Sequence, residues 1–486
     1  MRRASWGLGW ALLWAQAPVL IENADELGGT PERRLLQGHV RLRQDSLVLT
    51  CDWAALTADG AFQAEGHTQT QVGTQGAVWA PRLFYDPERR QLVYEGGVRA
   101  FFPPTILTAP KLVYDRNRAL IYYEGGGELQ DTTGVIRSPR GYYYTTEEKA
   151  TFGGGVWLER APYRGYSDSV AYDTRTYTAY FPGPLWAADT TRSDSLYGRR
   201  ATWNRLSGEV FLADSCRFWD SVRVVQAEAG YYHAERDSGW AFCRVYYQQG
   251  GVVWAWADSA SWVRDSLALR TNAALLWHQP EEIPVYLQAE RLSAHGTRLV
   301  AWDQAEWVQW PLRGRADTLV YDTLRQTVWL WGRVWLADTG MQMWAGAMQV
   351  RLRANRPDSA WAGGSVGLLS KADTFLWFFH QVRGDSAVAR WDTLGRLASM
   401  RFWGQVEAVY YQREEARWQG GHYLQAAELQ AELDSLQRPV YLRFSQRPQG
   451  TFWPATQLVK SPLWLRGLRW LPEPQRPQWP FGPRSE

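Results

Sequence analysis

The chain has 486 residues, 53 Lys and Arg against 50 Asp and Glu, a hydrophobic content of 45% and 3 cysteines. The near-neutral net charge of +3 argues against nucleic-acid binding, which needs a basic surface, and the 30 Trp, 24 Tyr and 16 Phe residues exclude a disordered chain. Three cysteines without CxxC spacing exclude a disulfide-stapled miniprotein and a zinc ribbon.

The N-terminal segment is typical of an export signal. Met1-Arg2-Arg3 precedes an uncharged stretch that ends in Ala15-Gln16-Ala17, so a basic region, a short apolar region and an A-x-A site follow one another. Pro18 would hinder cleavage after Ala17, and the uncharged run to Ile21 has about the shortest length that spans a bilayer. We therefore expect residues 1–20 to be a signal peptide, with an uncleaved membrane anchor as the alternative.

A repeat of about 29 residues covers the body of the chain. Leu107-Thr-Ala109-Pro-Lys-Leu112-Val-Tyr114-Asp115 aligns with Val78-Trp-Ala80-Pro-Arg-Leu83-Phe-Tyr85-Asp86, and the motif continues in both directions. Thirteen units are found, of which the last two carry insertions. Their anchor positions are Leu56, Tyr85, Tyr114, Tyr143, Tyr172, Trp203, Tyr232, Trp262, Ala294, Tyr321, Val350, Trp391 and Ala431.

The position five residues before each anchor supports this register, because it is small in every unit. It holds Cys51, Ala80, Ala109, Ser138, Ser167, Gly198, Ala227, Ala257, Ala289, Ala316, Ala345, Ser386 and Ala426.

Within a unit, apolar residues alternate with polar ones as in half-buried strands, and the parity changes between positions five and two before the anchor. A bend or bulge in each strand would keep the same face inward on both sides of the change. Pro81, Pro110 and Pro139 lie at this change of parity. Gly96-Gly97 and Gly125-Gly126 indicate a bend on the return strands. The sequence predicts an all-β fold: an elongated open β-jelly roll or β-solenoid of about thirteen units, with two bent strands each, over residues 21–437.

The last segment, residues 438–486, loses the repeat and becomes rich in proline. This composition predicts a C-terminal cap and tail.

Residues capable of catalysis or metal binding form no convincing constellation. The seven histidines are scattered, and no pair has the spacing of a helix-borne metal site. Asp86, Asp115, Asp173 and Asp322 are candidate paired carboxylates for glycoside chemistry, but their shared place in the repeat favours a turn residue. Gly153-Gly154-Gly155 lacks the helix start of a phosphate loop and is interpreted as a bend. We therefore expect neither an enzyme nor a cofactor or metal.

Two further groups of residues have more than one interpretation. One comprises tryptophans that are candidate sugar-stacking platforms, an apolar lining, or ordinary packing residues: Trp157, Trp254, Trp256, Trp329, Trp331 and Trp335. The other is the pair Cys216 and Cys243, which lie 27 residues apart, about one repeat, and are candidates for a disulfide in an oxidising compartment.

The repeat resembles the organic-solvent-tolerance-like (OstA-like) family, periplasmic β-jelly-roll proteins of the lipopolysaccharide transport bridge. The resemblance rests on Leu36-Gln-Gly38-His-Val40-Arg-Leu42 and Leu47-Val-Leu49-Thr-Cys51-Asp, and on residues 107–115 followed by Leu120-Ile-Tyr-Tyr-Glu124-Gly125. It extends over roughly residues 20–469 and is strongest over residues 36–219. The chain departs from short members in having about three times as many units.

The resemblance implies a non-enzymatic periplasmic conduit whose slot shields the acyl chains of lipopolysaccharide or a related glycolipid. It also implies end-to-end strand addition with other β-jelly-roll components, and an outer-membrane translocon as a partner. The membrane association, through an uncleaved N-terminus or at the outer membrane, stays open, as do a polysaccharide-binding or polysaccharide-active solenoid and a structural surface protein. The predicted slot residues are Val98, Leu107, Ala109, Leu112, Ile136 and Val170.

Overall fold

A computed structural model describes residues 18–471, apart from 45, 73–75, 103–104, 132–133, 281–282, 355, 373–377, 415–416, 436–437 and 459–462. Residues 1–17 of the predicted signal peptide and residues 472–486 of the predicted tail therefore lie outside the described residues. In the described part of the chain, no helix is both long enough and apolar enough to cross a membrane.

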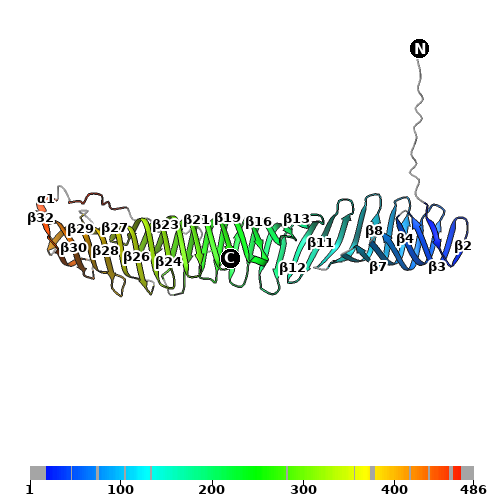
Figure 1. The fold of residues 1–486 in the computed structure, drawn as a ribbon, viewed down its shortest axis with the longest axis horizontal. Helices are drawn as coiled ribbons and strands as arrows, with labels where there is room; N and C mark the ends of the chain where they lie inside the picture. The colour runs from blue at the N-terminus through cyan, green and yellow to red at the C-terminus, as the bar shows by residue number, and fades with distance from the viewer. Residues whose placement is uncertain are drawn as a thin grey trace, which may run out of the picture. The chain divides into compact units, whose positions relative to one another are not determined.

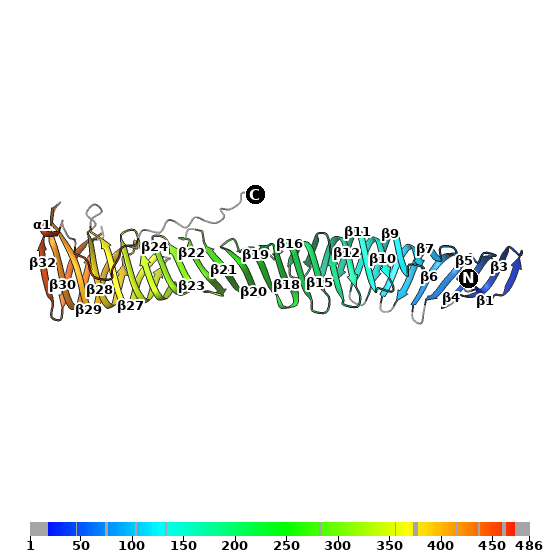
Figure 2. The same ribbon diagram turned by 90° about the horizontal axis from the view of Figure 1, so that it is seen from above.

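The fold is all-β, as the alternation predicts. The described residues form 32 strands, one 3-10 turn, η1 (Ala234–Arg236), and one short helix, α1 (Ala455–Leu458). Long strands pair antiparallel with the strands before and after them in the sequence, and short strands such as β13 and β14 share a long partner, β12 (Figures 1 and 2). The open β-jelly roll or solenoid of bent strands is thereby confirmed.

The chain divides into two compact units. Unit 1 comprises the described residues up to Ser221 together with Ala229–Ala234, and unit 2 comprises Val222–Glu228 and the residues from Glu235 onward.

The strands of unit 1 are β1 (Leu20–Asn23), β2 (Glu26–Gly29), β3 (Arg33–Gln44), β4 (Leu47–Thr57), β5 (Phe62–Val72), β6 (Gly76–Asp86), β7 (Gln91–Phe102), β8 (Thr105–Asp115), β9 (Leu120–Gln130), β10 (Val135–Tyr144), β11 (Lys149–Arg160), β12 (Tyr163–Asp173), β13 (Thr178–Phe181), β14 (Leu185–Asp189), β15 (Ser195–Asn204), β16 (Glu209–Trp219) and β18 (Ala229–His233).

The strands of unit 2 are β17 (Arg223–Ala227), β19 (Ser238–Gln249), β20 (Val253–Val263), β21 (Ser266–Trp277), β22 (Val285–His295), β23 (Arg298–Gln309), β24 (Leu312–Asp322), β25 (Thr327–Ala337), β26 (Met341–Arg353), β27 (Arg356–Lys371), β28 (Phe379–Trp391), β29 (Leu397–Glu414), β30 (Arg417–Leu433), β31 (Pro439–Ser445) and β32 (Gln449–Pro454).

Each long strand bends near its middle. The register between neighbouring strands shifts there, for example between Trp79 and Arg82 of β6 and between Glu95 and Val98 of β7. Gly96 and Gly97 have φ values of 96° and 95°, which only glycine adopts without strain. The predicted change of parity is therefore a bend shared by both strands of a pair. Where a bend becomes a break, one long strand appears as two, as in β13 and β14, which both pair with β12.

The small position before each anchor lies at this bend, next to the register shift. Ala80 pairs with Thr68 and Ala109 with Val98, both just past the shift. In the unit of β28 the equivalent residue is Gly384, which pairs with Val366. The assignment of Ser386 to this column was wrong by two residues, because the insertion in that unit moved the register.

The turns between strands are closed by the aspartates that follow the anchors. Asp86 accepts the Arg89 amide at 3.0 Å, and Asp173 accepts the Arg175 and Thr176 amides at 3.0 and 3.1 Å. Asp115 and Asp322 cap their turns in the same way. These contacts confirm the turn interpretation of the four residues.

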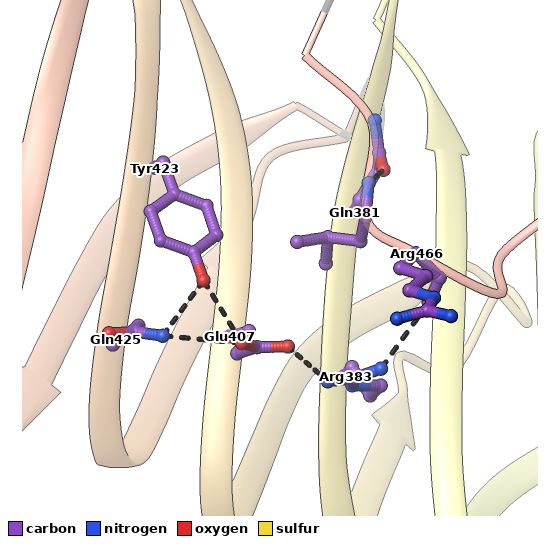
Figure 3. A network of polar contacts seen from close by, with 7 residues as sticks. Gln381, Arg383, Glu407, Tyr423, Gln425 and Arg466 are labelled. Atoms are coloured by element: carbon purple, nitrogen blue, oxygen red, sulfur yellow. Dashed lines mark hydrogen bonds and ion pairs between the residues drawn. The ribbon is translucent and has the colours of Figure 1, made fainter.

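The end of the described chain returns over the outer face of unit 2. We call residues 463–471 the strap. Gln381 donates to the Leu463 carbonyl at 2.8 Å and accepts the Leu465 amide at 2.7 Å, and Arg383 donates to the Arg466 carbonyl at 3.3 Å. Figure 3 shows that these polar contacts continue from Arg383 to Glu407 on β29, and from Glu407 to Tyr423 and Gln425 on β30.

Candidate functional site

The interior of unit 1 is the candidate site. Along β6, Val78, Ala80, Leu83 and Tyr85 are buried while the residues between them are more exposed, so the inward face changes parity at the bend. Each strand therefore contributes to two walls. The bend divides each strand into two halves. The halves that include Val78, Val98 and Leu107 form one wall, wing A, and the halves that include Leu83 and Leu112 form the other wall, wing B.

The two wings pack against each other. One buried apolar cluster contains residues of both, including Leu107 and Leu112. Near β18, the rings of Phe218 and Tyr232 lie on opposite wings with their centroids 5.5 Å apart. From β3 to β9 the interior of unit 1 is therefore one apolar cluster, filled by side chains from both walls.

The predicted slot residues divide into two groups. Val98, Leu107, Ala109 and Leu112 are buried, belong to this cluster and lie on the neighbouring strands β7 and β8, where Val98 pairs directly with Ala109. Val170 of β12 is also buried but lies outside the cluster, and Ile136 of β10 is half-buried. The structure thus brings the first four residues together in one cluster, and Ile136 and Val170 lie outside that cluster.

Charge is excluded from this interior. Among the described residues of unit 1, the buried charged side chains are Asp115 and Asp189, and both cap turns. Other buried polar residues of this unit are uncharged. At the bend, Ser138 and Ser167 each donate to a backbone carbonyl two residues on, at 3.0 Å, which satisfies their hydroxyls locally.

Three inward polar residues were missed by the reasoning from sequence: Thr68 and Thr70 of β5 and Tyr94 of β7. All three are at least 98% buried. Strand β5 reads Phe-Gln-Ala-Glu-Gly-His-Thr-Gln-Thr-Gln-Val, in which residues 67–71 of wing A are all polar, both the inward and the outward ones. No contrast of hydropathy marks its inner face, and only the register with β4 and β6 reveals it.

The candidate tryptophans point outward. Trp254 and Trp256 alternate with the buried Ala255 and Ala257, and Trp335 lies between the buried Val334 and Leu336 with Arg315 over its ring. Trp329 likewise alternates with the buried Val328 and Leu330, and Trp157 and Trp331 are exposed, so none of the six lines the interior. Trp157 of unit 1 is the most exposed of them, at 54%.

The titratable residues show no metal centre. In the described part of the chain, no three His, Cys, Asp or Glu side chains are close enough to hold a metal ion. His39 and His67 each pair with an aspartate at a bend, Asp25 at 2.8 Å and Asp52 at 2.7 Å. Cys216 is buried on β16 in unit 1, whereas Cys243 is exposed on β19 in unit 2.

A comparison with family models agrees with the resemblance in the sequence over part of the chain. A family model described as OstA-like protein matches residues 16–168, and a search of curated proteins found no match. Among solved structures, the chain is similar to LptH of Pseudomonas aeruginosa, the LptA-homologous periplasmic component of the lipopolysaccharide transport device. The identity is 18% and the TM-score 0.21, over 22% of this chain and 79% of that one. The family model thus covers the N-terminal part of this chain, within unit 1.

Proposed function

We propose that the protein is a non-enzymatic lipid conduit of the periplasm, which binds lipopolysaccharide or a related glycolipid and passes it towards the outer membrane. One observation carries the proposal: apolar side chains of both wings form one buried cluster from β3 to β9, and the buried charges among the described residues of unit 1 cap turns. An acyl chain moving along such an interior meets no charged barrier. Each methylene kept out of water is worth about 0.8 kcal/mol, so a multi-chain lipid needs this protection throughout.

Loading requires the two wings to separate, because their side chains fill the interior. The wings are covalently joined at the bends, where the small column keeps both walls close. Acyl chains entering from the turn side would replace contacts between the wings by contacts with lipid. The exchange trades one apolar contact for another and so costs little free energy.

The open sheet edges support the proposed partners. In the described residues, β1 and β2 pair only with β3, and β31 and β32 pair only with β30. Such edges accept further strands, so components with the same fold can join end to end, with the outer-membrane translocon as the terminal partner. Leu27 on β2 and Val440 on β31 are exposed apolar residues at these edges.

A second candidate is saccharide binding on the outer face of unit 1. Trp157, Tyr166 and Trp186 lie in register on β11, β12 and β14, and the Trp157 and Tyr166 ring centroids are 5.0 Å apart. Exposed aromatic rows of this kind often mark binding surfaces. The row would suit a sugar headgroup that stays in solvent.

Photo-crosslinking from adjacent residues tests the conduit. Leu107 points inward and is 8% exposed, whereas Thr108, next to it on β8, faces outward and is exposed. A photoreactive amino acid is placed at each position, and at Leu112, in cells that make labelled lipopolysaccharide. We expect adducts from Leu107 and Leu112, and none from Thr108.

Adducts from Thr108 alone would contradict an interior path and favour the outer face. A folded, exported protein without adducts at either inward position would show that the interior is a packed core, and would overturn the conduit.

A further inference from the structure

The inner faces of the two wings of unit 1 are more exposed over β9–β12 than over β3–β8. Equivalent places in the repeat show the change on wing A, where Val78 and Leu107 are buried and Ile136 is half-buried. On wing B, Tyr85 is buried, and Tyr143, two units further on, is half-buried. The buried apolar cluster of this unit accordingly ends at β9.

Short inward residues account for part of this exposure. Gly165 on β12 stands where Ile136 stands in the preceding unit, and Ala187 on β14 stands where Leu158 stands on β11. Leu158 pairs in register with Gly165, so it lacks a neighbouring side chain on that strand and is half-buried. Fewer apolar contacts therefore hold the wings together over these strands, and separating the wings costs the least free energy here.

An ion pair joins the two wings on the side of the molecule where the turns lie. Arg205, in the turn after β15 on wing B, donates to Asp131, in the turn after β9 on wing A, with Nη1 and Oδ2 3.0 Å apart. The two side chains are 25% and 21% exposed. Tyr172, a half-buried inward residue of β12, also forms a hydrogen bond with Arg205. The ion pair therefore closes the turn side of this weakly packed section.

A second arginine lies at the same place. Arg160 is the last residue of β11 on wing A, and its guanidinium lies 5.5 Å from the centre of the Trp203 ring on wing B, two residues before Arg205. In the part of the chain that the structure describes, no acidic side chain forms an ion pair with Arg160. Arg160 and Arg205 thus bring two positive charges to the turn side, of which Asp131 neutralises one. An additional anion would form favourable contacts with both guanidinium groups.

We propose that the turn side of unit 1 over β9–β12 is a lateral entry site for an acyl lipid with an anionic headgroup. The acyl chain enters between the wings, beside the half-buried Ile136 and Leu158. The headgroup binds Arg160 and takes the place of the Asp131 carboxylate at Arg205, so the contact that joins the wings is exchanged for a contact with lipid. This inference rests on the proposed function, since it takes the interior to be the lipid path.

Two probes with the same chain and different headgroups test the site on the purified full chain. Dodecyl phosphate has an anionic headgroup, dodecyl maltoside has an uncharged one, and inorganic phosphate is the probe without a chain. Affinities are measured by competition against an uncharged fluorescent alkyl probe. Arg160→Gln and Arg205→Gln each remove one positive charge, and Asp131→Asn removes the competing carboxylate. Arg175→Gln is the matched control, because Arg175 lies in the turn after β12 on wing B and pairs with Asp173 of that turn at 3.7 Å.

We expect wild type and Arg175→Gln to bind dodecyl phosphate about tenfold more tightly than dodecyl maltoside. Arg160→Gln and Arg205→Gln lose most of this preference and keep their affinity for the maltoside. Asp131→Asn binds dodecyl phosphate more tightly than wild type does, because no carboxylate competes for Arg205. The asparagine oxygen can still accept the Gly134 amide, which Asp131 accepts at 2.9 Å, so the turn is kept.

Equal affinity of wild type for dodecyl phosphate and dodecyl maltoside would overturn the entry site and leave the conduit standing. Inorganic phosphate that binds as tightly as dodecyl phosphate would show that the arginines hold an anion without its chain, and would also overturn the entry site. No binding of either alkyl probe would overturn both the entry site and the conduit.

The place of entry is tested by the time course of photo-crosslinking. A photoreactive amino acid is placed at Ile136, or at Leu107, the equivalent residue one unit earlier, and the protein is mixed with labelled dodecyl phosphate. We expect adducts at Ile136 before adducts at Leu107, because the chain reaches the buried cluster only after it has entered. Adducts at Leu107 first, or at both residues together, would contradict lateral entry, and no adducts at either residue would overturn the conduit as well.

Discussion

His380 on β28 makes unit 2 sensitive to acid. Burial lowers the pKa of its imidazole to about 4, from 6.5 in an exposed histidine. The ring stacks on Tyr410 with centroids 4.9 Å apart, and the Tyr411 amide points to it at 3.4 Å. Below pH 6.5 the unfolded chain takes up a proton that the folded protein refuses until about pH 4, so stability is lost as the pH falls through this window.

We expect the loss to be about 1–2 kcal/mol, less than the full shift implies, because part of the residue remains accessible. Urea unfolding between pH 7 and pH 4 measures it, and His380→Gln abolishes this component. His39→Asn is the control, since the Asp25 hydrogen bond raises the pKa of His39 and its contribution is lost at rising pH instead. An unchanged pH profile in His380→Gln would contradict the assignment.

The bends are the elements on which both wings depend, and glycine is essential to some of them. Gly126 on β9 has a φ of 105°, and a methyl group there would meet no neighbouring atom within 4 Å. Gly126→Ala therefore costs backbone strain alone, about 1–3 kcal/mol. Gly153→Ala on β11 is the matched control, because it too has open space but no positive φ.

Urea denaturation of the two variants decides the point. A clear drop for Gly126→Ala with little change for Gly153→Ala is expected, and equal effects would mean that the bend does not require glycine.

The bends are predictable from the sequence where glycine and proline mark them, and not elsewhere. Gly96-Gly97 and Gly125-Gly126 are visible as pairs, but in unit 2 the same left-handed bend is made by Cys243-Arg244, whose composition carries no such signal. Of the site, the apolar columns of β7 and β8 were predictable from alternation. Thr70 and Tyr94 were not, because a polar inward residue breaks the pattern that locates the inner face.

At the scale of the whole molecule, the strap makes the last described residues part of the folded structure of unit 2. Proline-rich composition suggested a cap and tail, but composition cannot say which face a segment covers. Gln342 and Gln381, both at most 1% exposed, fix the strap on this face because their side-chain amides form hydrogen bonds with its backbone. Each side-chain amide donates one hydrogen bond to the strap backbone and accepts one from it, as a paired residue of a β-sheet does. The strap therefore covers part of the outer face of β26 and β28.

Single substitutions can remove the hydrogen bonds between the glutamines and the strap. Gln342 donates to the Leu471 carbonyl at 2.7 Å and accepts its amide at 2.9 Å. In Gln342→Met both bonds are lost, and we expect the Leu471 amide to exchange with deuterium about 10- to 100-fold faster, because its opening is easier by the free energy of a buried hydrogen bond.

Gln349→Met is the matched control: it lies on the same strand, beyond the bend, and is only half-buried. It should leave the exchange of Leu471 unchanged, and Gln342→Met should leave that of Leu465 nearly unchanged, since Gln381 still holds it. Faster exchange at both amides in Gln342→Met would show that the strap opens as one piece. In that case the two glutamines act as a single cooperative latch and do not hold their own ends independently.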